Sequence, residues 1–365
     1  MNTASPTPSV LILYTGGTIG MRPGQNGLEP GGDFAKRARE ALNALPASRR
    51  QALPAFVFHE YDDPIDSSSA RPSQWYRLGD DIRRYGAGYA GVVVIHGTDT
   101  LAWSAASLAW QLDDWRSPVV VTGAQRPLEA EGSDGPGNLE FALTAAAHPA
   151  LSGVLVAFGD RLLEGAAARK WDTCADRAFA SPNASPCGKW CDHRLVLSFQ
   201  APESASSPKS AASADSASSV ERGRATPRLV RLVLWPGIEA QSTDALLQEA
   251  DGAILEAWGS GNLPEDPALI DSLESAAARG TALVVLSQCP GGATCLQSYA
   301  AGRSLIELGV IDGGAMTPEA AFTRLHWLLT CGFRGEGLRH RFMPNQTIIA
   351  DTLHCEHNAH SSNRC

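Results

Sequence analysis

The chain has 365 residues, 44% hydrophobic and 19% charged, so it can bury a sizeable core and wholesale disorder is not expected. The net charge of −9 and the pI of about 5.5 argue against nucleic acid or an anionic membrane as the main partner. No apolar stretch approaches the ~18 residues of a membrane span, and the N-terminus lacks the basic region of a signal peptide. We therefore expect a cytoplasmic protein whose eight cysteines are thiols.

Short apolar runs, each closed by glycine or a polar loop, recur along the chain and alternate with helical patterns. A helix is predicted over 101–115, with Leu101, Ala105, Leu108 and Leu112 on one face. Another is predicted after Thr317, with Pro318 and Glu319 in its first turn. Strands buried on both faces and alternating with helices predict an α/β fold with parallel sheets. The apolar runs are SVLILYTGG, YAGVVVIHGTD, SPVVVTGAQ, LSGVLVAFGD, PRLVRLVLWPG, DGAILEAWGSG and GTALVVLSQCPGG.

A change of composition divides the chain. Residues 201–226 are low-complexity sequence rich in Ser and Ala with almost nothing to bury, which predicts a flexible linker or hairpin tip. We therefore predict a larger N-terminal domain over 1–200 with a sheet and flanking helices, and a smaller C-terminal α/β domain over 227–350. The His- and Cys-containing tail, 351–365, is expected to be disordered.

No metal or cofactor site is predicted. The pairs Cys187/Cys191 and Cys289/Cys295 are not C-x-x-C motifs and have no histidine pair at zinc spacing. The glycine loop GGTIG is not the G-x-G-x-x-G pattern of dinucleotide-binding proteins, which argues against a dehydrogenase.

Two of the apolar runs end in loops that place a threonine beside glycine. YTGGTIGM puts Thr18 after two glycines, which let the backbone turn sharply and approach a ligand. IHGTDT puts Thr98 and Asp99 just before a predicted helix, whose N-terminus stabilises a carboxylate. Turn and capping roles would explain either loop alone. Both loops are nevertheless expected at the carboxyl ends of parallel strands, where ligands bind in such sheets.

A threonine nucleophile needs a base, because its hydroxyl is weak at its free pKa. His96 is not clearly this base, since a structural role explains the histidine equally well. Lys170, in LEGAAARKWDT, follows an apolar strand and is expected at the same edge of the sheet. Desolvation lowers the pKa of a lysine and so lets it accept a proton. The ordinary alternative for Lys170 is a solvated loop residue.

YTGGTIGM, IHGTDT, VTGAQRPL followed by SDGPGNL, and ARK before AFASPN together resemble the bacterial-type L-asparaginase family. The match is closest to its cytoplasmic type I branch and covers residues 8–200 and, more loosely, 227–350. The resemblance implies hydrolysis of the side-chain amide of L-asparagine, with L-glutamine as a possible second substrate, by a homodimer or homotetramer.

The resemblance also implies site residues. Thr18 matches the nucleophile that forms a β-aspartyl ester, while Thr98, Asp99 and Lys170 match a second, triad-like set, so both threonines are assigned as catalytic. The oxyanion site would use backbone N–H groups around Thr98 and in the TGAQ loop.

Substrate-binding residues follow from the same resemblance. Asp99 would pair with the α-ammonium, and Ser67 in DPIDSSS would hold the α-carboxylate, flanked by Asp66 and Ser68. A solvated turn is the simple alternative for the DSSS segment. Asn262, in WGSGNLP, is a further candidate that would complete the site of a neighbouring subunit.

Two departures from the family pattern stand out. Leu28 occupies the place of a tyrosine that contacts the first threonine, so the loop is threaded differently, another group substitutes, or activity is weakened. Arg169 and Glu256 occupy positions of polar groups in an effector pocket found in some type I members. We expect Arg169 and Glu256 to face each other and fill that pocket, which would remove effector control.

Two alternatives remain. One is an amidohydrolase for another amide, such as glutamine, or a subunit of a tRNA-dependent amidotransferase, although neither a tRNA-binding surface nor an extra N-terminal module is evident. The other is a non-catalytic relative that binds an amino acid, which only Leu28 favours.

Overall fold

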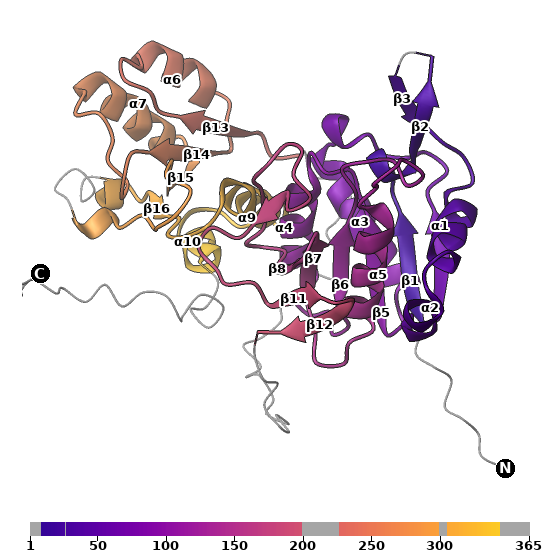
Figure 1. The fold of residues 1–365 in the computed structure, drawn as a ribbon. Coiled ribbons are helices and arrows are strands. Elements are labelled where there is room, and N and C mark those ends of the chain that lie inside the picture. Colours follow the sequence, from indigo (N-terminus) through magenta and orange to yellow (C-terminus); the bar gives the residue numbers. More distant parts are fainter. Residues whose placement is uncertain (1–8, 26, 199–225, 299–304, 344–365) are drawn as a thin grey trace, which may run out of the picture.

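The computed structural model describes residues 9–25, 27–198, 226–298 and 305–343, which form two α/β units (Figure 1). The fold class is confirmed: a large N-terminal sheet and a smaller C-terminal sheet, each with flanking helices. All but the last residue of the segment 201–226, and the whole tail 351–365, lie outside the described residues. The boundaries at 200 and 227 therefore stay a prediction.

The N-terminal sheet has eight strands in the order β12-β11-β8-β7-β6-β5-β1-β4. The five strands from β7 to β4 are parallel, and all of them except β4 lie in predicted apolar runs, whereas β8, β11 and β12 continue the sheet in antiparallel fashion. The strands are β1 (Val10–Tyr14), β4 (Phe56–Glu60), β5 (Gly91–Ile95), β6 (Val119–Thr122), β7 (Val154–Phe158), β8 (Arg161–Glu164), β11 (Gly188–Cys191) and β12 (Arg194–Leu197).

Helices cover both faces of this sheet, because alternate residues of each buried strand point to opposite sides. In β1, Val10 and Ile12 pack toward α1 and α5, while Leu11 and Leu13 pack toward α3 and α4. The helices are α1 (Phe34–Asn43), α2 (Ala47–Ala52), α3 (Pro72–Tyr85), α4 (Leu101–Gln111) and α5 (Gly135–Ala146). Two ribbons, β2 (Met21–Gly24) with β3 (Gly27–Pro30) and β9 (Arg169–Lys170) with β10 (Phe179–Ala180), lie outside the main sheet.

The C-terminal sheet has four parallel strands in the order β13-β14-β15-β16. Apolar residues of α6 and α7 pack on one face, and those of α9 and α10 on the other. Thr317 caps α9 by accepting a hydrogen bond from Ala320 N–H, which confirms the predicted helix start. The elements are β13 (Leu229–Val233), α6 (Ala240–Leu247), β14 (Gly252–Ala257), α7 (Pro267–Ala278), β15 (Ala282–Ser287), β16 (Ile311–Asp312), α9 (Pro318–Thr330) and α10 (Gly335–Phe342), with a 3₁₀ turn over Leu296–Ser298. None of the helices within the described ranges is long and apolar enough to cross a membrane.

Helix α9 joins the two units, because one side covers the C-terminal sheet and the other packs along α4 (Figure 1). Trp110 of α4 donates its indole N–H to Thr323 Oγ1 of α9 at 3.0 Å. Tyr76 of α3 places its hydroxyl 2.5 Å from His326 Nδ1, and His326 is 2% exposed. The contact between the units is thus partly polar and shielded from water.

The buried His326 makes this contact sensitive to acid. Burial lowers the pKa of His326 to about 4, from the ~6.5 of an exposed histidine. Between these values the unfolded chain binds the proton more tightly, so stability is lost as the pH falls from 6.5 toward 4. We expect urea unfolding to show that His326→Gln removes about 2–3 kcal/mol of the stability difference between pH 7 and pH 4.5. An unchanged pH dependence in the variant would refute the assignment.

Candidate active site

The two threonine loops lie side by side because β1 and β5 are parallel neighbours. Tyr14 is paired with Ile95, the last residues of the two strands, so both loops leave the sheet at the same edge. A methyl group added to Gly17, whose φ is +97°, would lie 2.6 Å from the backbone nitrogen and Cα of Gly97. This approach requires glycine at position 17 and places the loops of Thr18 and Thr98 in direct contact.

A third segment packs against this junction. Ser67 is 7% exposed, and a Cβ added to Gly97 would lie 2.3 Å from its Oγ. Thr100 Oγ1 donates to the Ser67 carbonyl at 2.9 Å, and Ile65 N–H donates to the Thr15 carbonyl at 2.6 Å. Three chain segments far apart in sequence therefore meet at one edge of the sheet.

Asp66 and Ser68 flank Ser67 but bond to each other. The Asp66 carboxylate accepts hydrogen bonds from Ser68 N–H at 3.0 Å and from the hydroxyls of Ser68 and Ser69. These bonds, led by the one from the Ser68 hydroxyl, hold the pKa of the exposed Asp66 below its usual range. In this arrangement Asp66 caps the 3₁₀ turn Ser67–Ser69 that presents Ser67.

Lys170 lies between Thr98 and Asp99. Its Nζ donates to Thr98 Oγ1 at 2.9 Å and to Asp99 Oδ1 at 2.7 Å. The Lys170 side chain is 22% exposed and that of Asp99 is 62% exposed, while Thr98 is buried. The lysine reaches this edge by a route that the sequence does not predict. Strand β8 runs back along β7, and Lys170 is carried by the separate β9–β10 ribbon.

Thr18 begins the 3₁₀ turn Thr18–Gly20 and is partly exposed. Among the residues that the structure describes, no side chain is hydrogen-bonded to its hydroxyl, whereas the Thr98 hydroxyl is bonded to an amine. The Thr18 hydroxyl is thus free to contact a ligand, whereas the Thr98 hydroxyl lies beside a potential base.

His96 and the TGAQ loop build the frame of the site. His96 is fully buried, with Nδ1 2.8 Å from Gly97 O and Nε2 3.0 Å from Ser104 Oγ, and burial lowers its pKa. Both ring nitrogens of His96 therefore lie within hydrogen-bond distance of neighbouring residues. Gln125 N–H donates to the Asp134 carboxylate at 2.8 Å, so this N–H of the TGAQ loop is not available for an oxyanion.

Sequence reasoning missed Arg37, which holds the loop that follows Thr18. Arg37 is 5% exposed, donates to the Gly20 carbonyl at 2.9 Å, and forms a two-point pair with Glu129. The bond to Glu129 raises the pKa of Arg37 and lowers that of Glu129. An arginine within a polar helix carries no signal of burial, so the sequence could not have singled it out.

Comparison with known proteins assigns the family. The family described as "Asparaginase, N-terminal" matches residues 9–203, and "Glutaminase/Asparaginase C-terminal domain" matches residues 228–342. The chain belongs to the asparaginase family. L-asparaginase 1 of Escherichia coli K12 is 35% identical over 92% of this chain and 96% of its own length.

The proteins similar to this chain are not all named for the same activity. L-asparaginase I of Vibrio cholerae has a TM-score of 0.78 and 34% identity, covering 92% of this chain and 97% of that one. The human 60 kDa lysophospholipase is 34% identical over 89% of this chain and 58% of its own length. A sequence similar to this chain therefore also occurs in a protein named for a different reaction.

The expected pairing of Arg169 with Glu256 in this asparaginase-family chain is wrong. Arg169 Nε lies 3.7 Å from Glu319 Oε1, at the start of α9, and Glu256 is bonded instead to Arg231 of the neighbouring strand. The four groups nevertheless form one cluster, because the charges of Arg169, Arg231 and Glu256 all act on the pKa of Glu319. The sequence identified two members of the cluster and paired them incorrectly.

Leu28 and Asn262 are not among the residues that make the contacts just described. Leu28, on the β2–β3 hairpin, pairs with Pro23 and is 49% exposed. Asn262 closes a turn in the C-terminal unit, where its N–H donates to the Trp258 carbonyl at 2.8 Å. A role in a neighbouring subunit's site stays a prediction.

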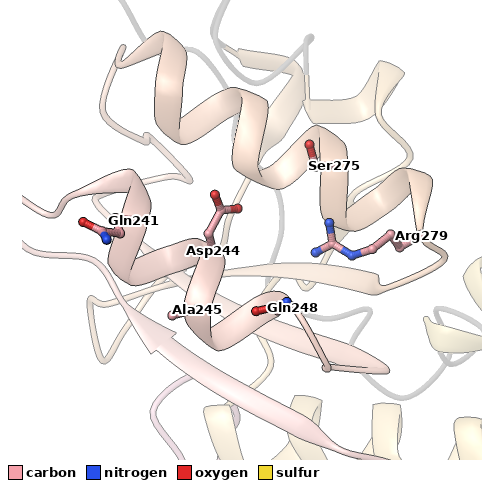
Figure 2. Close-up of a pocket in the computed structure, with 6 residues that line it drawn as sticks. All are labelled: Gln241, Asp244, Ala245, Gln248, Ser275 and Arg279. Carbon is pink, nitrogen blue, oxygen red and sulfur yellow. The ribbon is translucent and has the colours of Figure 1, made fainter.

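A surface hollow of about 470 Å³ lies between α6 and α7, remote from the threonine loops. Figure 2 shows its polar lining, in which Asp244 and Arg279 come from facing helices. Its lining residues are Gln241, Asp244, Ala245, Gln248, Ser275 and Arg279. None of them belongs to the motifs that the asparaginase family match carries at the edge of the N-terminal sheet.

Proposed function

We propose that the chain hydrolyses the side-chain amide of L-asparagine to L-aspartate and ammonia. The observation that carries the proposal is the placement of Lys170 Nζ within hydrogen-bond distance of both Thr98 and Asp99, beside the loop of Thr18. Family membership and the relatives named L-asparaginase support the same reaction.

The first half of the proposed reaction forms an acyl-enzyme. Thr18 Oγ1 attacks the amide carbon, its proton passes to the leaving nitrogen, and the C–N bond breaks to release ammonia. A β-aspartyl ester on Thr18 remains. Backbone N–H groups around Thr98 would stabilise the oxyanion that develops on the amide oxygen. The Thr18 hydroxyl, which has no hydrogen-bond partner among the described residues, suits the nucleophile's role.

The second half removes the acyl group. Lys170, as a neutral or proton-sharing base, accepts a proton from Thr98, which in turn takes a proton from water, and the resulting hydroxide attacks the ester carbon. The ester C–O bond breaks, Thr18 recovers its proton and aspartate leaves. The same Lys170–Thr98 pair would serve if Thr98 attacked first, so both threonines are placed in the catalytic machinery.

Substrate orientation would come from charge complementarity. Asp99 accepts from Lys170 through Oδ1, which leaves its second oxygen for the α-ammonium. Ser67 is placed against the Thr98 loop and would donate to the α-carboxylate. Asp66 and Ser68 would act by holding the turn of Ser67, in line with their mutual hydrogen bonds.

The exposed Leu28 has no hydroxyl to offer Thr18, and water is our proposed substitute. An amino-acid-binding relative without turnover is the alternative that Leu28 favours, and glutamine is the alternative substrate. We further propose a homo-oligomer acting in the cytoplasm on this small-molecule substrate, without a metal or cofactor.

The test is ammonia release from L-asparagine, L-glutamine and succinamate, which is asparagine without its α-ammonium. We expect asparagine to give the highest kcat/KM and succinamate to be at least about 100-fold poorer, because Asp99 would be left without its partner. Thr18→Ala, purified in parallel, should release no ammonia and so exclude a contaminating amidase. Absence of turnover, together with a rise in melting temperature on adding asparagine, would favour the binding-protein alternative.

A further inference from the structure

The strand that carries Lys170 has little support of its own. Strand β9 contains only Arg169 and Lys170, and it pairs with β10 in a ribbon outside the eight-stranded sheet. The ribbon packs into the N-terminal core through Phe179 of β10, whereas both residues of β9 are only half-buried, and a strand pair of this length is marginally stable in water by itself. The position of Lys170 Nζ must therefore depend on what the ribbon is attached to.

The two residues of strand β9 make side-chain contacts in opposite directions. Adjacent residues of a strand point in opposite directions, so Lys170 faces Thr98 at the amino end of α4 while Arg169 faces away from it. Arg169 Nε lies 3.7 Å from Glu319 Oε1 in the first turn of α9. Thr98 lies just before α4 and Glu319 lies in the first turn of α9, and these two helices pack along each other.

Glu319 is unusual among the carboxylates of the structure. Its side chain is 9% exposed, and within the described residues its Oε2 has no hydrogen-bond partner. Burial raises the pKa of Glu319, while Arg169 and Arg231 oppose that shift and Glu256 adds to it. A buried carboxylate without a full set of partners costs stability, which calls for a compensating role.

We propose that Glu319 is a positioning residue for the amidase reaction: through Arg169 it anchors strand β9 and so holds Lys170 within reach of Thr98 and Asp99. The C-terminal unit thereby contributes to the catalytic geometry of its own chain. The catalytic part of the inference rests on the proposed function, whereas the anchoring itself does not. Displacement of a catalytic base by as little as 1 Å is enough to slow a reaction by about 10–100-fold.

The first experiment compares Glu319→Gln with a control from the same cluster, Glu256→Gln. Glu256 is equally buried but pairs with Arg231, not with β9. Both variants replace one buried carboxyl group by an amide of nearly the same shape, so a general loss of stability should appear in both melting curves. We expect only Glu319→Gln to lower kcat for asparagine, by about tenfold, with KM changed less than twofold.

The second readout does not need activity. Trp171 N–H donates to the Ala178 carbonyl at 2.7 Å, so its hydrogen–deuterium exchange reports opening of the β9–β10 ribbon. We expect exchange at this amide to be at least about tenfold faster in Glu319→Gln and unchanged in Glu256→Gln. Unchanged exchange in Glu319→Gln would overturn the anchoring, whether or not the wild-type chain hydrolyses asparagine.

Arg169→Gln provides a second route to the same interaction. If Arg169 and Glu319 act as one unit, the double variant should be no slower, and exchange no faster, than the more affected single variant. Faster exchange with an unchanged kcat would overturn the catalytic part. A wild-type chain without amidase activity would refute the proposed function, while the exchange data would still decide the anchoring.

Discussion

Replacing Lys170 with methionine should lower kcat for asparagine by about 10³-fold or more, because no other amine adjoins Thr98 in the described structure. Methionine keeps the length and apolar stem of lysine but cannot accept a proton. Thr98→Val should have a loss of similar size, since it removes the hydroxyl through which Lys170 would act. Steady-state ammonia release at saturating asparagine measures both effects.

The double variant tests whether the side chains of Thr98 and Lys170 act together in one step. Groups that act as a unit lose their joint contribution when either is removed, so Thr98→Val combined with Lys170→Met should be no slower than the slower single variant. Lys189→Met is the matched control, because Lys189 is an exposed lysine on β11 that contacts neither threonine loop. Losses that multiply in the double variant would show that Thr98 and Lys170 act in separate steps.

The sequence predicts the parts of the fold that depend on local pattern. The apolar runs at β1, β5, β6 and β7 are strands, because unbroken burial on both faces leaves few other options. The antiparallel strands β8, β11 and β12 were not predicted. Each is four residues long and carries polar or exposed positions, so its pairing is decided by the neighbouring strand more than by its own sequence.

The same distinction applies to the candidate site. The threonine loops could be placed because each follows a buried parallel strand and strand ends meet at one edge. The partner of Arg169 could not be predicted, because the pairing depends on where the first turn of α9 lies relative to a ribbon 150 residues earlier in the chain. Glu319 was identified only as an acidic residue in a helix first turn, a role that is local and visible in sequence.

Gly17→Ala should disrupt both threonine loops at once. Position 17 has φ of +97°, and a Cβ there would lie 2.6 Å from the backbone of Gly97, closer than unstrained atoms approach. Neither neighbour is a flexible side chain, so the loops of Thr18 and Thr98 must separate. We expect kcat/KM for asparagine to fall about 100-fold or more, measured by ammonia release.

Gly88→Ala separates the clash from the backbone strain. Gly88 has a similar φ of +89° but has open space where a Cβ would lie, so alanine there meets the strain alone, about 1–2 kcal/mol. Urea unfolding should therefore show both variants destabilised, with Gly17→Ala the more affected, while only Gly17→Ala loses activity. Equal activity in the two variants would mean that the junction of the threonine loops tolerates separation, and that the close Gly17–Gly97 contact does not set the catalytic geometry.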